Sequence, residues 1–172
     1  MKTKLPHSLL VVAMMALLAP PLLHAKKVEF PADDPAFTFT MPDDWTTETG
    51  KDGRIYCTAP DGFKIGIVAS PAVSDADDAT KLLPTILKGM ADAMKCENYK
   101  AEEAKTGEMG KLSLASMRGQ CKSEGTEMAL NAVVFSLEPG TYFTIVGAAP
   151  AIVDKAHDKE MNQLIRSITA VE

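Results

Sequence analysis

Three cysteines, Cys57, Cys96 and Cys121, carry the most informative chemistry in this sequence of 172 residues. Thiols pair as disulfides in oxidising compartments and stay reduced in the cytosol. A hairpin that turns symmetrically at 107–110 would place Cys96 opposite Cys121, with Cα atoms ~4.5 to 5.5 Å apart, which is within disulfide range. The sequence therefore predicts a disulfide between Cys96 and Cys121, and a pairing that involves Cys57 is the alternative.

Cys57 is then the odd thiol, in a strand between Tyr56 and Thr58. No neighbouring histidine, arginine or lysine pattern indicates a lowered thiol pKa, so a nucleophile is not expected. The sequence favours a buried, inert thiol. An intermolecular disulfide is the alternative if Cys57 faces solvent.

His157 is the only histidine after residue 24, which excludes a multi-histidine metal site in that part of the chain. We expect it on the polar side of the last helix, as a solvated residue beside Asp154 and Asp158. The sequence has no Gly-x-Ser-x-Gly elbow to supply a nucleophile for it. We therefore predict no enzymatic activity, no catalytic residues and no cofactor.

Methionines supply the one candidate for soft-metal chemistry. Met90 and Met94 lie one helical turn apart, and with Met161 they could offer thioethers to Cu(I). The same residues fall on apolar helical faces, where methionine packs well in a core. Core packing is the favoured interpretation, and no metal site is predicted.

Aromatic residues define the candidate binding patch: Trp45, Tyr56 and Tyr142. If these three side chains converge on the surface, they would form a patch suited to protein recognition. Trp45 is the only tryptophan, and a role as an anchor of the core is the favoured alternative.

The first 25 residues have the order of parts of a signal peptide. Lys2 and Lys4 precede an apolar run at residues 9–18, and prolines and the small residue Ala25 follow. An apolar run of about ten residues is too short to cross a ~30 Å hydrocarbon core. We predict cleavage after Ala25, no stable membrane insertion, and a periplasmic or secreted domain over residues 26–172.

The charge balance limits the kinds of partner. Removal of residues 1–25 takes two lysines from the 18 basic residues and none of the 23 acidic ones, so the formal net charge changes from −5 to −7. This sign disfavours nucleic acid, and it favours basic partners if electrostatic steering operates.

Apolar spacing predicts a single α+β domain. Two helices are expected from their period of 3.6 residues, at 74–95 and 154–168, with Asp75, Asp77 and Asp78 at the start of the first. If the first helix begins before Lys81, Pro84 lies within it and removes a backbone donor. Strands are expected at 37–41, 54–58, 63–69, 99–104, 112–121, 128–136 and 141–149.

The strand Ala132–Phe135 is apolar on both sides, so the helices are expected on opposite faces of the sheet. The predicted fold is an antiparallel sheet of about six to seven strands between two helices, an α/β/α sandwich.

The motif Phe37–Trp45, in which a strand ends in Pro-Asp-Asp-Trp, precedes a strand ending in Pro60–Gly62, a helix, a meander and a closing helix. In this order of elements the chain resembles the PsbP-like and DcrB-like proteins, although it lacks the lipid-acceptor cysteine of some bacterial relatives. The resemblance implies an antiparallel sheet between helices and a role as an accessory, assembly or binding protein.

These observations lead to three hypotheses. The first is a non-enzymatic, exported accessory protein that binds another protein of the cell envelope through a sheet face or a helix–sheet groove. The second is an immunity or inhibitor protein against a secreted toxin or hydrolase, which a large acidic patch would favour. The third is a carrier of a small ligand or metal, which needs a pocket of several hundred cubic ångströms or converging thioethers.

Overall fold

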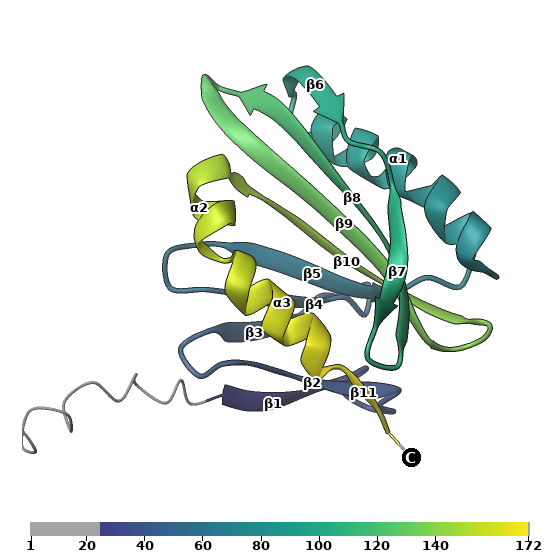
Figure 1. Cartoon of the computed structure of the whole chain (residues 1–172). Coiled ribbons are helices and arrows are strands. Elements are labelled where there is room, and N and C mark those ends of the chain that lie inside the picture. Colours follow the sequence, from purple (N-terminus) through teal and green to yellow (C-terminus); the bar gives the residue numbers. More distant parts are fainter. Residues whose placement is uncertain (1–24, 172) are drawn as a thin grey trace, which may run out of the picture.

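The computed structural model describes residues 25–171, as two antiparallel sheets and three helices (Figure 1). The predicted signal peptide, apart from Ala25, lies outside the described residues. The large sheet has eight strands: β3 (Thr46–Thr49), β4 (Ile55–Thr58), β5 (Lys64–Ala69), β10 (Thr141–Pro150), β9 (Thr126–Glu138), β8 (Leu112–Ser123) and β6 (Glu97–Ala101) in spatial order, with β7 (Lys105–Met109) beside β8. The small sheet has the order β1 (Ala25–Phe30), β2 (Phe37–Pro42) and β11 (Thr169–Ala170).

The helices cover opposite faces of the large sheet, as predicted. Helix α1 (Ala76–Ala93) lies on one face, and α2 (Ala151–Ala156) and α3 (Asp158–Ser167) lie on the other (Figure 1). Along β9, Leu130 and Val134 pack in the core cluster beneath α1, whereas Phe135 packs in the cluster on the opposite side. Side chains that alternate along β9 thus enter both core clusters, which is why the stretch Ala132–Phe135 is apolar on both sides.

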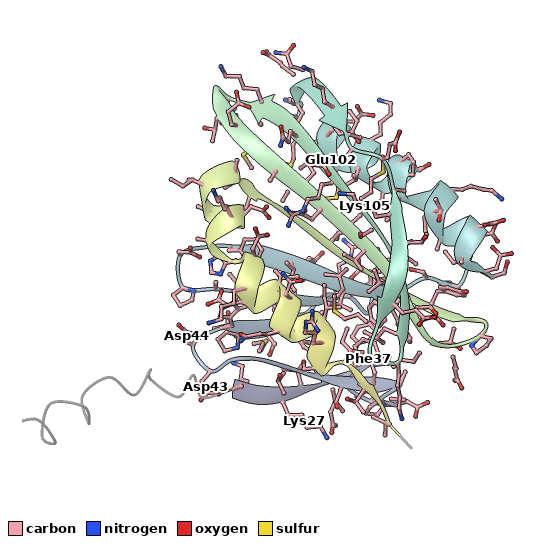
Figure 2. All side chains as sticks on the ribbon, viewed as in Figure 1. Lys27, Phe37, Asp43, Asp44, Glu102 and Lys105 are labelled. Carbon is pink, nitrogen blue, oxygen red and sulfur yellow. A yellow bond between two sulfur atoms is a disulfide. The ribbon has the colours of Figure 1, made fainter. Side chains whose placement is uncertain are left out.

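The α+β sandwich is confirmed, with more strands than predicted. The segment Phe37–Pro42 does not join the large sheet but pairs with β1 and β11, and the small sheet covers part of the face that α3 leaves open. Phe37 is fully buried between the sheets, with its ring centroid 4.8 Å from that of Phe143 on β10 (Figure 2).

Helix α1 begins at Ala76 rather than near Lys81. Asp75 caps it, because its carboxylate accepts a hydrogen bond from the backbone N–H of Asp78 at 2.8 Å. Pro84 therefore lies within the helix, where it has no backbone N–H to donate. Leu83 and Leu87 are fully buried beside it, so tertiary packing holds the helix through this position.

The predicted last helix is divided in two at His157. Helix α2 ends at Ala156 and α3 starts at Asp158, and the backbone N–H of His157 still bonds to the carbonyl of Asp154 at 3.1 Å. The division lets α3 cross toward β2 and bury Leu164 and Ile165 against the phenylalanine-rich core.

Candidate binding groove between α3 and β7

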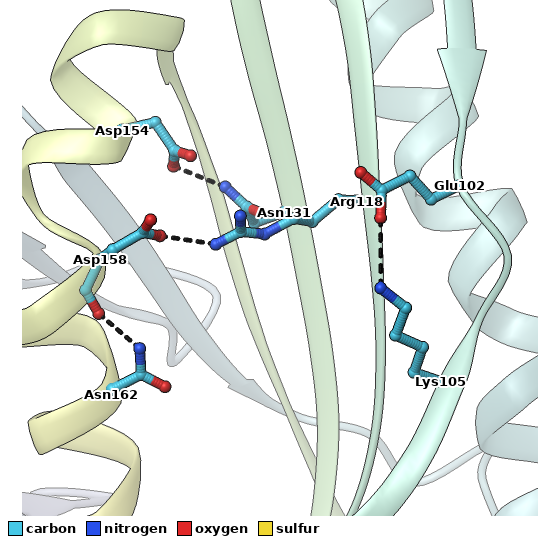
Figure 3. A network of polar contacts seen from close by, with 7 residues as sticks. All are labelled: Glu102, Lys105, Arg118, Asn131, Asp154, Asp158 and Asn162. Carbon is cyan, nitrogen blue, oxygen red and sulfur yellow. Dashed lines mark hydrogen bonds and ion pairs between the residues drawn. The ribbon is translucent and has the colours of Figure 1, made fainter.

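A groove of about 370 Å³ lies between α3 and β7 in the described part of the chain. The middle strands of the large sheet form its floor, and the β6–β7 connection and the two C-terminal helices form its walls (Figure 3). The apolar residues that line it are Phe63, Ile65, Met109, Leu114, Met117, Ala132, Val133, Ile145, Met161 and Ile165.

The floor of the groove is only partly covered by its neighbours. Leu114 and Val133 pack against the core beneath α3 but are only half-buried, as is Met161 on the neighbouring helix. Apolar surface that remains in contact with water gains free energy when a partner covers it, at about 25 cal/mol per Å². The groove is therefore suited to an apolar group.

Polar residues form the rim of the groove (Figure 3). Arg118 on β8 donates from Nη2 to Oδ1 of Asp158 at 2.6 Å. Its cross-strand neighbour, Asn131 on β9, donates from Nδ2 to Oδ1 of Asp154, also at 2.6 Å. These two contacts tie the sheet to α2 and α3.

Two further contacts complete the rim. Asn162 donates from Nδ2 to the backbone carbonyl of Asp158 at 2.7 Å. On the opposite wall Lys105 lies 3.5 Å from Oε2 of Glu102, measured from Nζ (Figures 2 and 3). Both walls thus carry charged groups around the apolar floor.

The charged residues of the rim shift the pKa values of Arg118 and Asp154. The hydrogen bond from Arg118 to Asp158 raises the pKa of the guanidinium, and Asp154 and Glu102 raise it further. Burial raises the pKa of Asp154, and the charge of Asp158 adds to this, while Arg118 and Asn131 act against it. The negative charge of Asp154 is therefore only partly compensated by its neighbours.

His157 is buried, which corrects the expectation of a solvated residue. Its Nε2 lies 2.9 Å from Oδ2 of Asp61 in the β4–β5 turn, and its Nδ1 contacts the carboxylate of Glu160. The ring stacks on Phe63 with centroids 4.5 Å apart and meets the edge of Trp45. Its helical spacing suggested the surface, but the break between α2 and α3 turns it inward.

The two carboxylates also determine what His157 can do. Each ring nitrogen faces one of them, so neither is free to take a proton from a serine or cysteine nucleophile. No cluster of histidine, cysteine or acidic residues in the described range has the arrangement of a metal site. The histidine instead fastens the α2–α3 junction to the turn at Asp61.

The pH dependence of stability follows from this contact. Burial is the largest single effect and lowers the pKa of His157, but the hydrogen bonds and charges of Asp61 and Glu160 together raise it above 6.5. A histidine whose pKa is higher in the folded than in the unfolded chain stabilises the fold. This stabilisation is complete at a pH below the pKa of the unfolded chain, and it is lost as the pH rises through the pKa of the folded chain.

We therefore expect the stability difference between the native chain and His157→Gln to shrink from about pH 5 to about pH 9. Urea unfolding across this range measures it. Because residues 26–172 contain one histidine, an NMR titration of this segment gives the pKa directly. A value below 6.5, or a difference that grows with pH, contradicts the expectation.

The candidate patch of Trp45, Tyr56 and Tyr142 is not formed. Trp45 is 2% exposed and packs in the core beneath α3, which confirms its role as a core anchor. Tyr142 packs in the cluster beneath α1, on the opposite face of the sheet. Tyr56 is half-buried and lies under the ammonium of Lys64, which is 4.2 Å from its ring centroid. The three rings therefore do not converge.

The methionines are separated in the same way. Met90 and Met94 pack in the cluster beneath α1, whereas Met161 packs beneath α3, with the large sheet between them. The hypothetical three-thioether copper site is wrong, because its ligands lie on opposite faces of the sheet.

Cys96 and Cys121 form a disulfide, as predicted, with Cα atoms 5.6 Å apart. The register that led to the prediction is shifted: Glu97 pairs with Lys122, and the hairpin turn lies at Gly110 and Lys111 rather than at 107–110. Cys96 precedes β6, where the chain leaves α1, and from there its side chain reaches β8.

Cys57 is unpaired and fully buried on β4. Burial raises the pKa of its thiol to about 12, although the charge of Lys26 acts in the opposite direction. A thiol in this state is a weak nucleophile at neutral pH. Cys57 is thus a buried free thiol, which is the interpretation that the sequence favoured.

The rim residues Arg118, Asn131 and Glu102 were not singled out from the sequence. A signal was present for Asn131, which is a polar interruption in an otherwise apolar stretch of β9, whereas Arg118 lies in a strand that also holds three serines, a glutamine and a lysine. Their opposition across β8 and β9 became visible only with the correct register.

No helix in the described range is long and apolar enough to cross a membrane. No protein-family model and no curated protein matches the sequence. Solved structures do match. Cyanobacterial PsbP (CyanoP) from Synechocystis has a TM-score of 0.64 at 12% identity, with 89% of this chain and 96% of that chain covered.

LpqN of Mycobacterium tuberculosis, a protein involved in cell envelope biogenesis, has a TM-score of 0.59 at 15% identity, with 87% and 92% covered. A protein from Bacteroides thetaiotaomicron has a TM-score of 0.58 at 17% identity, with 86% of this chain and 48% of that chain covered. Similarity to the DcrB-like proteins stays a prediction. At these identities the likeness concerns the fold, and the chain has a PsbP-like fold.

Proposed function

We propose that this chain is a non-enzymatic accessory protein, exported after cleavage near Ala25, which binds another protein of the cell envelope through the groove between α3 and β7. The observation that carries the proposal is the combination of an open apolar floor and a polar rim. Such a combination is typical of surfaces that accept a partner segment, because apolar burial provides affinity and the rim provides orientation.

Two further observations support the proposal. LpqN, which shares the fold, is involved in cell envelope biogenesis. The polar side chains of the groove bond to one another across separate elements, so the rim is organised before a partner arrives. Preorganised side chains lose less conformational entropy on binding.

A groove-blocking variant tests the proposal. Asn162 is exposed on α3 and lines the groove, so Asn162→Trp should fill it without disturbing the core. Gln163 is the exposed neighbour that does not line the groove, and Gln163→Trp is the matched control. In affinity capture from envelope extract with residues 26–172 as bait, a stoichiometric partner should be lost, by about tenfold or more, with Asn162→Trp only.

Retention of the partner by both variants would move the binding surface away from the groove. Loss from both would indicate a general effect of the added tryptophan. Circular dichroism and urea unfolding of the three proteins establish that they are equally folded.

A volume of about 370 Å³ also favours a second candidate, a carrier of a small ligand. Ligand pockets commonly measure roughly 300–1,000 Å³ and are mostly apolar with a few polar groups. A carrier purified without denaturation should retain its ligand, which native mass spectrometry would detect as an added mass that Asn162→Trp removes. An unliganded native chain that still captures its protein partner would favour the first candidate.

A further inference from the structure

The charges around the groove are unequal. Four acidic residues line it against two basic ones: Glu102, Glu103, Asp154, Asp158, Lys105 and Arg118. A bound segment therefore enters a site with an excess of negative charge. This excess is local, in addition to the acidic balance of the chain as a whole.

The two basic groups are already engaged. Lys105 pairs with Glu102, and Arg118 pairs with Asp158. Of the two remaining carboxylates, Asp154 accepts a hydrogen bond from the neutral amide of Asn131, and Glu103 has no ion pair among the described residues. One carboxylate on each wall thus has no ion pair among the described residues.

A cation of a bound partner would compensate the negative charge of Asp154. It is half-buried, where screening by water is weaker, and the negative charge of Asp158 lies on the next helix. A partner's ammonium or guanidinium could reach it from the open mouth of the groove, since both Asp154 and the apolar floor line the same hollow. The groove can then bind an apolar group and a cationic group of the partner at the same time.

We propose that the groove recognises a protein segment in which a large apolar side chain is flanked by lysine or arginine. The apolar side chain covers Leu114, Val133 and Met161, while the flanking cations pair with Asp154 on one wall and Glu103 on the other. This inference rests on the proposed function, because it specifies the partner of the same groove. An anionic lipid headgroup or an acidic segment meets the wrong charge at the rim.

Fluorescence anisotropy with three labelled peptides tests the inference. The first carries Lys-Leu-Phe-Lys within a Gly-Ser background, the second has glutamate in place of both lysines, and the third has serine in place of leucine and phenylalanine. The first should bind at least about tenfold more tightly than either of the others, and its affinity should fall as salt is raised.

Charge-removing variants locate the effect. Asp154→Asn and Glu103→Gln should each weaken the lysine-flanked peptide about threefold and leave the glutamate-flanked peptide unchanged or tighter. Asp34→Asn, in the exposed β1–β2 loop, makes the same change in net charge and should leave the affinity unaltered. Equal effects of Asp154→Asn and Asp34→Asn would overturn local recognition.

The outcomes separate this inference from the proposed function. If the lysine- and glutamate-flanked peptides bind equally and Asn162→Trp blocks both, the groove is the binding site and the charge inference is wrong. If the lysine-flanked peptide binds but Asn162→Trp leaves it bound, the groove assignment itself is wrong. If no peptide binds, recognition of an isolated segment is overturned, whereas partner capture that Asn162→Trp abolishes would still support the groove.

Discussion

Replacement of Phe37 by alanine is expected to lower the free energy of unfolding by about 4 kcal/mol. Phe37 has no exposed surface, and its ring lies within 6.2 Å, between centroids, of four other phenylalanine rings. Two of these are on the small sheet and two on the large sheet, so its loss leaves a cavity where the sheets meet. The cavity adds to the lost transfer free energy because close-packed neighbours relax only partly.

Urea unfolding followed by Trp45 fluorescence measures this loss. Since whole domains are stable by only about 5–15 kcal/mol, the alanine variant is examined together with Phe37→Leu, for which we expect a loss of about 1.5 kcal/mol. Val171→Ala, at an exposed apolar residue, is the control and should change stability by less than about 0.5 kcal/mol. A loss below about 1 kcal/mol for Phe37→Ala would show that the small sheet is not packed as described.

Removal of the disulfide is expected to lower the free energy of unfolding by about 3 kcal/mol. The bond joins residues 25 positions apart, and it restricts the unfolded chain more than the folded one. It also fixes the end of α1 to β8, where Ser123 donates from Oγ to the carbonyl of Met94 at 2.9 Å. Alanine is the suitable replacement at Cys121, because that residue is buried and a serine hydroxyl would need a partner.

The double variant Cys96→Ala/Cys121→Ala is compared with the native chain, each with and without a thiol reductant. Reductant should destabilise the native chain by about the same 3 kcal/mol and leave the double variant unchanged. Cys57→Ala is the matched control: it removes the buried thiol but should keep the full response to reductant. No response of the native chain would contradict the disulfide.

The two helices and their opposite placement could be predicted because periodicity reports which side of an element is buried. The pattern of Ala132–Phe135, apolar on both sides, needs cover on both faces, and the structure supplies it. Periodicity does not report which strands pair. Phe37–Pro42 has the alternation of a sheet strand, and only tertiary packing places it in a separate sheet with β11.

The site was harder to predict for the same reason. The groove depends on the β8–β9 register, which brings Arg118 opposite Asn131, and a shift of one strand by one residue would turn one of these two side chains to the other face. His157 looked like a surface residue because a continuous helix was assumed. The break after Ala156 is a tertiary effect: burial of Leu164 and Ile165 redirects the chain, and Phe63 and Asp61 then enclose the imidazole.

The pairing of β11 with β2 has a consequence for how the chain reaches its folded state. Synthesis delivers a chain from its N-terminus, so β2 emerges early, whereas α3 and β11 arrive last. Until they arrive, the backbone N–H of Thr40 lacks the Ser167 hydroxyl that accepts its hydrogen bond at 2.8 Å, and the core cluster of Phe39 lacks Leu164 and Ile165. A nascent or prematurely terminated chain therefore exposes apolar surface of the kind that chaperones and quality-control proteases recognise.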